Sequence, residues 1–308
     1  MIGSLPVEKS HVEILPDPRG CYSLLPVGCL RLGTREWHPG SFGIMAVINR
    51  TPDSFFDRGA TAEFGAALDA AGQAVADGAD IVDIGGVKAG PGEEVTSAAE
   101  IDRVAGLVAA VRERHPDVVI SVDTWRAEVG EVVAQAGADL LNDAWGGADP
   151  RLAEVAAAHR IGLVCSHAGG LPPRTRPHRP AYRDLVRDVT AYVTNYAERS
   201  VASGVRECSI LVDPAHDFGK NTWQSLELTR CLADLTATGW PVLAAVADKD
   251  FIGETLALPV DQRAEGTLAT LAVCGWLGAR IFRVHDVPAT RQALAAVTQL
   301  RAPMPPAP

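Results

Sequence analysis

Polar and charged residues follow the ends of several short apolar runs, and their side chains fall into two chemical groups. The first group offers carboxylate acceptors, an amide and a cation, which suit the edge of a flat heterocycle with amino and carbonyl groups. It contains Asp123, Asn142, Asp213 and Lys249. The second group offers donors for phosphate oxygens, which an arginine grips through two parallel hydrogen bonds. It contains Asn49, Arg283 and His285.

Each of these residues by itself has an ordinary structural explanation, because a polar side chain after a strand often caps the next helix. The full set is harder to explain in this way. Arg283 and His285 are two positions apart in one apolar run, so their side chains face the same side of a strand. The alternative for this pair is a structural ion pair with Asp286.

Eight apolar runs alternate with segments of helical periodicity. The runs span residues 42–48, 81–84, 118–122, 140–142, 163–165, 210–212, 242–246 and 281–284. The helical segments span residues 64–77, 97–115, 127–136, 151–159, 182–203, 222–238, 262–277 and 289–300. Continuous apolar strands that are each followed by a helix are typical of a parallel sheet covered on both faces. Eight such units predict an α/β protein with a single (β/α)8 TIM barrel, whose mouth lies at the carboxyl ends of the strands.

The predicted barrel spans residues 42–300. We expect an N-terminal leader at residues 1–41, loose or folded as a short hairpin over the barrel, because it holds five prolines and little periodicity. Residues 301–308 form a Pro-rich tail. An open doubly wound sheet is the alternative fold, although no Gly-x-Gly-x-x-Gly segment follows the first strand.

The composition excludes several classes of protein. The formal charge is −10, from 28 Lys and Arg against 38 Asp and Glu, so we expect no nucleic acid partner. The chain has no long uncharged apolar run and no signal-peptide pattern at its start, so we expect no membrane partner and a cytoplasmic location. Its six cysteines form no Cys-x-x-Cys pair and have no His at metal spacing, which favours reduced thiols over a zinc site.

Seven segments of the chain, taken in order, resemble the signatures of the dihydropteroate synthase family. They are residues 48–55 (Ile-Asn-Arg-Thr-Pro-Asp-Ser-Phe), 78–86 with 91–92, 121–124 (Ser-Val-Asp-Thr), 142–143, 213–214 with 218–220, 249, and 283–286 (Arg-Val-His-Asp). The resemblance runs over about residues 42–300. It implies a pterin-binding (β/α)8 barrel and usually a homodimer.

The family reaction condenses 6-hydroxymethyl-7,8-dihydropterin diphosphate with p-aminobenzoate and releases diphosphate. The resemblance assigns the pterin to Asp123, Asn142, Asp213 and Lys249. It assigns the diphosphate to Asn49, Arg283 and His285, with Asn49 also next to Mg²⁺. Positive charge stabilises the departing diphosphate, and a closing first loop excludes water. With that loop, the implied catalytic residues are Asn49, Thr51, Asp53, Lys249, Arg283 and His285.

The chain departs from the family pattern mainly around the second substrate. The family's Glu-Ser-Thr-Arg-Pro-Gly loop reads Val-Lys-Ala-Gly-Pro-Gly at residues 87–92, and its Ser-Arg-Lys-Ser reads Ala-Asp-Lys-Asp at residues 247–250. The family's Gly-Ile-Gly reads Ala-His-Asp at residues 215–217. The region implied for the second substrate contains Lys88, Ala89, Gly90, Phe218 and Asp248.

Groups for a pterin and a diphosphate are therefore kept, while groups for a benzoate are lost. Asp248 and Asp250 would repel a carboxylate, although Lys88 could restore some positive charge. These departures resemble the diverged second synthase paralogue of actinobacteria, which is regarded as inactive. Three hypotheses remain: a diverged protein with weak or no dihydropteroate synthesis, a working dihydropteroate synthase of folate biosynthesis with altered loops, and a binding protein without turnover.

Overall fold

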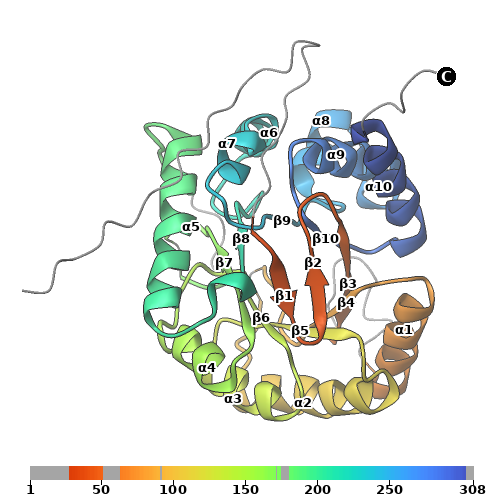
Figure 1. The fold of residues 1–308 in the computed structure, drawn as a ribbon, viewed down its shortest axis with the longest axis vertical. Coiled ribbons are helices and arrows are strands. Elements are labelled where there is room, and N and C mark those ends of the chain that lie inside the picture. Colours follow the sequence, from red (N-terminus) through yellow and green to blue (C-terminus); the bar gives the residue numbers. More distant parts are fainter. Residues whose placement is uncertain (1–27, 51–62, 91, 171, 175–179, 303–308) are drawn as a thin grey trace, which may run out of the picture.

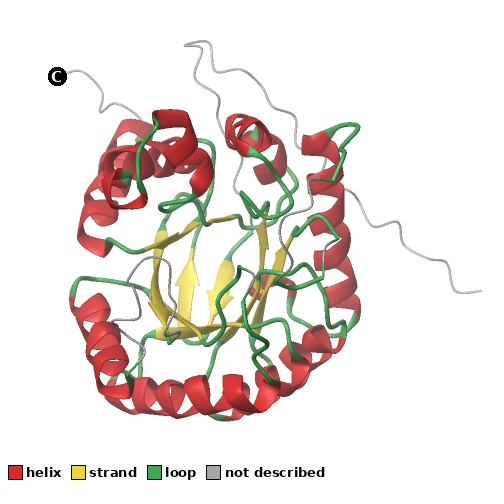
Figure 2. Ribbon diagram, turned by 180° about the vertical axis from the view of Figure 1, so that it is seen from behind, coloured by secondary structure: helices red, strands yellow, loops and turns green. Residues whose placement is uncertain are grey.

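The computed structural model describes residues 28–50, 63–90, 92–170, 172–174 and 180–302. Eight parallel strands form one sheet in the order β8-β7-β6-β5-β4-β3-β10-β9, and a parallel bridge between Val212 and Val242 joins its two ends. Their bounds are β3 (Gly43–Asn49), β4 (Ile81–Gly85), β5 (Val119–Asp123), β6 (Leu140–Asp143), β7 (Gly162–Ser166), β8 (Ile210–Asp213), β9 (Leu243–Ala244) and β10 (Ile281–Val284). The predicted (β/α)8 barrel is confirmed, and Figures 1 and 2 show the helices arranged around its strands.

The helices follow the strands along the chain. They are α1 (Phe64–Ala76), α2 (Ser97–Arg114), α3 (Ala127–Gln135), α4 (Arg151–His159), α5 (Leu185–Ala202), α6 (Thr222–Arg230), α7 (Leu232–Thr236), α8 (Asp250–Leu256), α9 (Ala264–Trp276) and α10 (Val287–Arg301), with short 3-10 turns η1 (Glu207–Ser209) and η2 (Val260–Gln262). Two features differ from the sequence prediction. The helix expected over residues 222–238 is divided at Cys231, whose φ of −100° and ψ of 20° interrupt it, and α8 was not predicted.

Left-handed glycines end several helices just before the next strand. Gly78, Gly137 and Gly278 have φ values of 96°, 111° and 103°. Only glycine adopts such values without a steric cost, so these residues turn the chain back into the barrel.

The barrel interior begins with a purely apolar layer. Every strand contributes one fully or almost fully buried side chain to it: Met45, Ile81, Val119, Leu140, Val164, Leu211, Leu243 and Ile281. A hairpin of β1 (Leu30–Leu32) and β2 (Arg35–Trp37) packs Leu30, Leu32 and Trp37 against this layer. Figure 1 shows the hairpin lying across the barrel opening. It closes the amino-terminal end of the barrel, so the site must lie at the other end.

A second apolar core separates the outer face of the sheet from the helices, with alternate strand residues such as Ile44, Val82 and Ile120 packed against α1 and α2. Successive strand residues therefore point alternately into the barrel and out toward the helices. A closed barrel wrapped by helices requires apolar residues at the outward positions. In the described part of the chain, no helix combines the length and the apolar character needed to cross a membrane.

Candidate active site

A layer of polar side chains lies directly above the apolar floor of the barrel. Because side chains alternate along a strand, the residue two positions beyond each floor residue also points inward. In six strands that residue is polar: Asp83, Ser121, Asn142, Ser166, Asp213 and Arg283. The pleat of the sheet, rather than the loops, therefore places the core of the candidate site.

Asp83 is the centre of this layer. Its side chain is fully buried and accepts hydrogen bonds from Ser121 Oγ at 2.6 Å, from Asn142 Nδ2 at 3.1 Å and from Arg283 Nε at 2.7 Å. A buried carboxylate is tolerated only with such partners. Our sequence prediction missed Asp83 because it lies inside an apolar run instead of past its end. A charged residue within the run 81–84 was the signal that could have revealed it.

Arg283 joins two carboxylates across the barrel. Its Nη2 lies 3.2 Å from Asp123 Oδ2, in addition to its bond with Asp83. Burial raises the pKa of Asp123 to about 7; Arg283 works against this rise, and the charge of Asp83 adds to it. Burial works to lower the pKa of Arg283, but the two carboxylates raise it overall. The alternative explanation for Arg283, an ion pair with Asp286, is not found: Arg283 pairs with Asp83 and Asp123, and Asp286 accepts from the Ala289 amide at 2.9 Å and caps α10.

Asn49 lies at the carboxyl end of β3, next to β4. The strand register pairs Asn49 with Gly85 and Gly85 with Asp123. A Cβ on Gly85 would lie 3.2 Å from Asn49 Oδ1 and 3.8 Å from Asp123 Cβ. Glycine at this position therefore leaves room for the side-chain oxygen of Asn49 beside β4.

Lys249 and Asp213 form the opposite side of the mouth. Lys249 Nζ donates to the backbone oxygen of His216 at 2.6 Å and lies 4.6 Å from the centre of the Phe218 ring. Burial lowers the pKa of Lys249, and the charges of Asp217 and Asp213 oppose that fall. Burial raises the pKa of Asp213, and Lys249 opposes the rise.

The loop after β8 keeps a conformation that favours glycine, although the family's glycines are replaced here. Ala215 and Asp217 have φ values of 51° and 68°. Side-chain contacts offset the strain: Asp217 bonds Ser225 Oγ at 3.0 Å and the Phe251 amide at 3.2 Å. The buried His216 meets Thr229 Oγ1 at 3.1 Å and stacks on Phe251. Ala215 and Asp217, which stand in place of the family's glycines, therefore adopt a left-handed backbone, and His216 and Asp217 add side-chain contacts to the loop.

Lys220 holds the same loop from below. Its side chain is buried, and Nζ donates to the backbone oxygens of His167 at 2.8 Å, Ala215 at 3.0 Å and Phe218 at 2.8 Å. Burial lowers its pKa to about 7, while the charge of Asp213 works in the opposite direction. One ammonium group thus ties the ends of β7 and β8 together.

Three aromatic rings form a wall of the mouth. Trp145 makes edge-to-face contacts with Trp125 at 6.3 Å and with Phe218 at 5.2 Å between ring centres. Phe218 in turn lies beneath the ammonium group of Lys249. Such rings offer flat surfaces to a planar ligand beside the polar layer.

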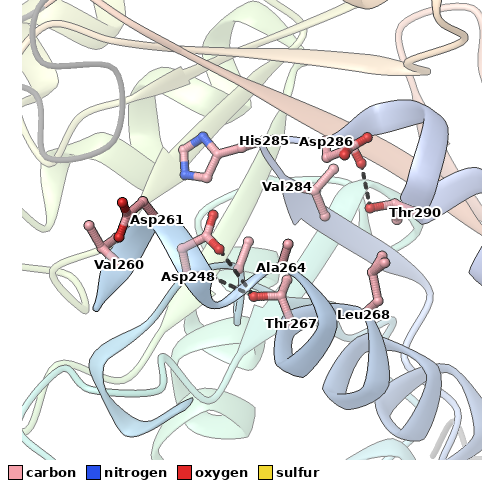
Figure 3. A pocket seen from close by; sticks show the side chains of 11 residues that line it. Asp248, Val260, Asp261, Ala264, Thr267, Leu268, Val284, His285, Asp286 and Thr290 are labelled. Atoms are coloured by element: carbon pink, nitrogen blue, oxygen red, sulfur yellow. Dashed lines mark hydrogen bonds between the residues drawn. The ribbon is translucent and has the colours of Figure 1, made fainter. Parts of the chain in front are cut away.

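His285 and Asp248 line one cavity of about 330 Å³ between the end of β10 and the helices α9 and α10. Figure 3 shows both side chains at this cavity together with Asp261. Asp248 has a φ of 55° and is held by Thr267, whose Oγ1 lies 3.0 Å from its amide and 3.2 Å from its Oδ1. Burial raises the pKa of Asp248, and the charge of Asp286 adds to the rise.

The loop that carries Lys88, Ala89 and Gly90 is held by a residue that we did not predict. Arg174 Nε donates to the backbone oxygens of Lys88 at 3.2 Å and Gly90 at 3.3 Å, and its Nη1 donates to that of Glu93 at 2.5 Å. A basic run after the fifth strand was the available signal, but it gave no hint of the partner loop.

Of the other predicted residues, Thr51 and Asp53 lie outside the described residues. Asp250 does lie within them, and its Oδ1 pairs with Arg263 Nη1 at 3.0 Å. That pairing offsets part of the negative charge expected near the second substrate.

The mouth of the barrel combines buried hydrogen-bond acceptors, an amide and two cations with a group of aromatic rings on one side. Acceptors and donors in fixed positions can bind the edge of a flat heterocycle, and a guanidinium can bind an anion beside it.

Comparison with known proteins agrees with this geometry. Residues 45–285 match the model of a family described as pterin binding enzyme. A Mycobacterium bovis protein named inactive dihydropteroate synthase 2 is 54% identical over 267 residues, covering 85% of this chain and 84% of that protein. Bacillus subtilis dihydropteroate synthase is 39% identical over 246 residues, covering 79% and 83%.

The fold comparison gives the same result. A crystal structure of Yersinia pestis dihydropteroate synthase with a sulfonamide drug is similar with a TM-score of 0.83 and 34% identity, covering 89% of this chain and 99% of that one. The resemblance inferred from the sequence is therefore confirmed. The chain belongs to the pterin binding enzyme family, among the relatives of dihydropteroate synthase.

Proposed function

We propose that this protein binds a pterin carrying a diphosphate in the mouth of the barrel, and that it carries out little or no dihydropteroate synthesis. The observation that carries the proposal is an asymmetry between the two halves of the mouth. The polar layer around Asp83 is complete, whereas Ala89 and Gly90 stand where the family has threonine and arginine. The name of the Mycobacterium bovis relative supports the same reading.

The pterin would lie flat against the aromatic wall with its edge toward the polar layer. Asp123 and Asp213 accept hydrogen bonds from ring and amino N–H groups, and Asn142 and Lys249 donate to ring nitrogen and carbonyl oxygen. Asn142 is oriented for this role because Asp83 holds its Nδ2 at 3.1 Å. Water is excluded from the floor by the apolar layer below.

The diphosphate would lie beside Arg283, His285 and Asn49. An arginine has five donors, and the bonds of Arg283 to Asp83 and Asp123 use only two of its nitrogens. These carboxylates hold the guanidinium in place and leave its remaining N–H groups for phosphate oxygens. His285, two positions further on, faces the neighbouring cavity.

Magnesium fits this region through Asn49, because an amide oxygen is a hard ligand that suits Mg²⁺. Among the residues that the structure describes, no three carboxylate, imidazole or thiol groups of the mouth lie at mutual ligand distance. The ion would therefore depend on the diphosphate oxygens and water for its other ligands. When bound, it neutralises charge on the leaving diphosphate.

The proposal includes a homodimer, which is usual in the family, and a cytoplasmic location. The dimer has a candidate contact surface. Val273 and Trp276 on α9 and Leu300 on α10 are 47%, 48% and 72% exposed. Large exposed apolar side chains on neighbouring helices are typical of a contact surface. Light scattering should give the mass of a dimer, and Trp276→Glu should give a monomer.

The test is an assay of purified protein with 6-hydroxymethyl-7,8-dihydropterin diphosphate, Mg²⁺ and p-aminobenzoate, together with calorimetric titration of the pterin diphosphate alone. We expect binding without formation of dihydropteroate. Asn142→Ala should weaken binding more than tenfold, whereas Trp223→Ala, on the exposed start of α6, should leave it unchanged.

Two outcomes would overturn the proposal. Turnover near roughly 1 per second would show a working dihydropteroate synthase whose altered loops accept p-aminobenzoate. The absence of binding at millimolar pterin diphosphate would show that the retained residues serve the fold alone.

A further inference from the structure

The outer face of the β1–β2 hairpin gathers three metal-binding side chains at the end of the barrel opposite the mouth. The hairpin pairs Leu30 with Trp37 and Arg31 with Glu36, so the register places Cys29 across from His38. Leu30 and Trp37 point into the barrel, and the alternation of the strand turns the neighbouring side chains outward. Cys29, Glu36 and His38 therefore share one face.

The three ligand atoms lie close to one another. Cys29 Sγ is 2.7 Å from Glu36 Oε1, and His38 Nδ1 is 3.7 Å from the same oxygen. All three ligand atoms lie within 4.8 Å of one another. Ligand atoms around a tetrahedral zinc ion are separated by about 3.5 Å, given bonds of about 2.0–2.3 Å. Small side-chain rotations would bring the three atoms to that spacing.

A neighbouring arginine orients the carboxylate. Arg31 Nη2 bonds Glu36 Oε2 at 2.8 Å, which leaves Oε1 turned toward Cys29 and His38. Partners of this kind, which hold a ligand without touching the metal, are usual around zinc sites. The ladder between β1 and β2 also fixes the backbone of Glu36.

A second thiol lies beside this group. Cys208 is in η1, which packs against β1, and Ser209 Oγ bonds the backbone oxygen of Arg31 at 2.8 Å. Cys208 is half-buried, and its thiol lies outside the set of three ligand atoms that are within 4.8 Å of one another, so it would have to move toward them to bind the same ion. It is the natural source of a fourth ligand, since structural zinc sites are usually four-coordinate.

We propose that Cys29, Glu36 and His38 form a site for a divalent metal ion of the zinc type, with Cys208 as the fourth ligand. A thiolate, an imidazole and a carboxylate are the donors that zinc prefers, and they exclude Mg²⁺ and Ca²⁺ as the favoured ions. On binding, the Cys29 thiol loses to solvent the proton that it now donates to Glu36. The ion would clamp the hairpin to η1 beneath the apolar floor.

From the sequence we expected reduced thiols and no zinc site, because the cysteines form no Cys-x-x-Cys pair and have no His at metal spacing; eight residues separate Cys29 from His38. The hairpin register brings the two together. Because this site lies on the closed end of the barrel, it is independent of the function proposed for the mouth.

The experiment uses the full chain after treatment with a chelator. Co²⁺ is titrated first, because a cysteine ligand gives a thiolate-to-cobalt absorption band and tetrahedral coordination gives intense visible bands. Zn²⁺ then displaces Co²⁺ and gives the zinc affinity. We expect one ion per chain, with both bands present.

The variants separate the site from adventitious binding. Cys29→Ser should remove the larger part of the thiolate band and leave only the share of Cys208. His38→Ala, whose side chain is 73% exposed and so tolerates change, should weaken zinc binding more than roughly tenfold. Cys208→Ser should lower the intensity of the thiolate band and weaken binding. Cys231→Ser, at a half-buried cysteine between α6 and α7, is the matched control and should change nothing.

The result that overturns the proposal is equal zinc affinity in the wild type, Cys29→Ser and His38→Ala, or a stoichiometry far below one. A thiolate band that Cys208→Ser leaves unchanged would assign the fourth position to another ligand and overturn that part. Circular dichroism of each variant shows that the fold is retained.

Discussion

Asp123 is a carboxyl group of the mouth whose raised pKa lies near neutral pH. Its carboxylate is held by Arg283 at 3.2 Å, yet burial raises its pKa to about 7. The group is therefore mostly protonated at pH 6 and mostly ionised at pH 8. Because the ionised form accepts hydrogen bonds more strongly from pterin N–H groups, the affinity for a pterin should depend on pH in this range.

We expect the affinity of the wild-type protein for the pterin diphosphate to rise with pH through about 7. For a single group with this pKa, the ionised fraction rises roughly tenfold from about pH 6 to about pH 8. Calorimetric titration at the two pH values measures the change. Asp123→Asn keeps the shape and one acceptor but cannot ionise in this range, so its affinity should rise with pH less than that of the wild type. A wild type with equal affinity at both values would contradict the prediction.

At the scale of elements, α8 ends in a conformation that its sequence does not favour. Ala257 caps α8 with a φ of 54° and ψ of 42°, and its side chain is exposed. The left-handed conformation costs an L-residue roughly 1–2 kcal/mol, which glycine avoids.

Ala257→Gly should therefore raise the free energy of unfolding by about 1 kcal/mol. The matched control is Ala136→Gly at the end of α3, where φ is −77° and glycine should instead cost about 0.5–1 kcal/mol. Urea denaturation of both variants measures the difference. Changes of the same sign in the two variants would refute the strain argument.

The loops after β7 and β8 depend on Lys220, which donates to three backbone oxygens. Lys220→Met keeps most of the volume but leaves these oxygens without their donor, so it should lower the free energy of unfolding by about 2 kcal/mol at pH 7. Denaturation by urea measures the loss.

The pH dependence of this loss has a definite sign. The pKa of Lys220 is about 7 in the folded protein, below the usual 10.5. Between these values the unfolded chain binds more protons, so the wild type gains stability as the pH rises, and this gain is lost as the pH falls through about 7. The difference between the wild type and Lys220→Met should therefore grow from pH 7 to pH 9. A constant difference would show that the pKa of Lys220 is not lowered in the folded protein.

At the scale of the whole molecule, the hairpin closes the amino-terminal end of the barrel. Trp37 is 5% exposed and packs on the apolar floor layer, and Arg280 Nη1 bonds the backbone oxygen of Gly28 at 2.6 Å across the junction. The polar layer lies directly above the apolar floor of the barrel. Loss of the hairpin should therefore lower the stability of the fold that holds the residues of the mouth in place.

Trp37→Ala should lower the free energy of unfolding by roughly 3–5 kcal/mol, because it removes a large buried side chain and leaves a cavity. Trp223→Ala, at a tryptophan that is 78% exposed, should change it by less than about 0.5 kcal/mol. Chemical denaturation of both variants provides the comparison. A small loss for Trp37→Ala would show that the floor is closed by the strands alone.

The sequence by itself determined the architecture and the chemical character of the site. Apolar runs alternating with helical segments predicted the barrel, and polar residues after the runs predicted the mouth. These features depend on neighbours a few positions apart, so they can be read along the chain.

Only the tertiary structure decided which groups meet. Asp83 and Arg283 are 200 residues apart in the sequence, and Arg174 and Gly90 are 84 residues apart. Neither pairing follows from a periodic pattern in the sequence. Such contacts arise when the barrel closes and its strands come into register. For the same reason the approach of Cys29 and His38 follows from the pairing of β1 with β2 and from nothing in their spacing.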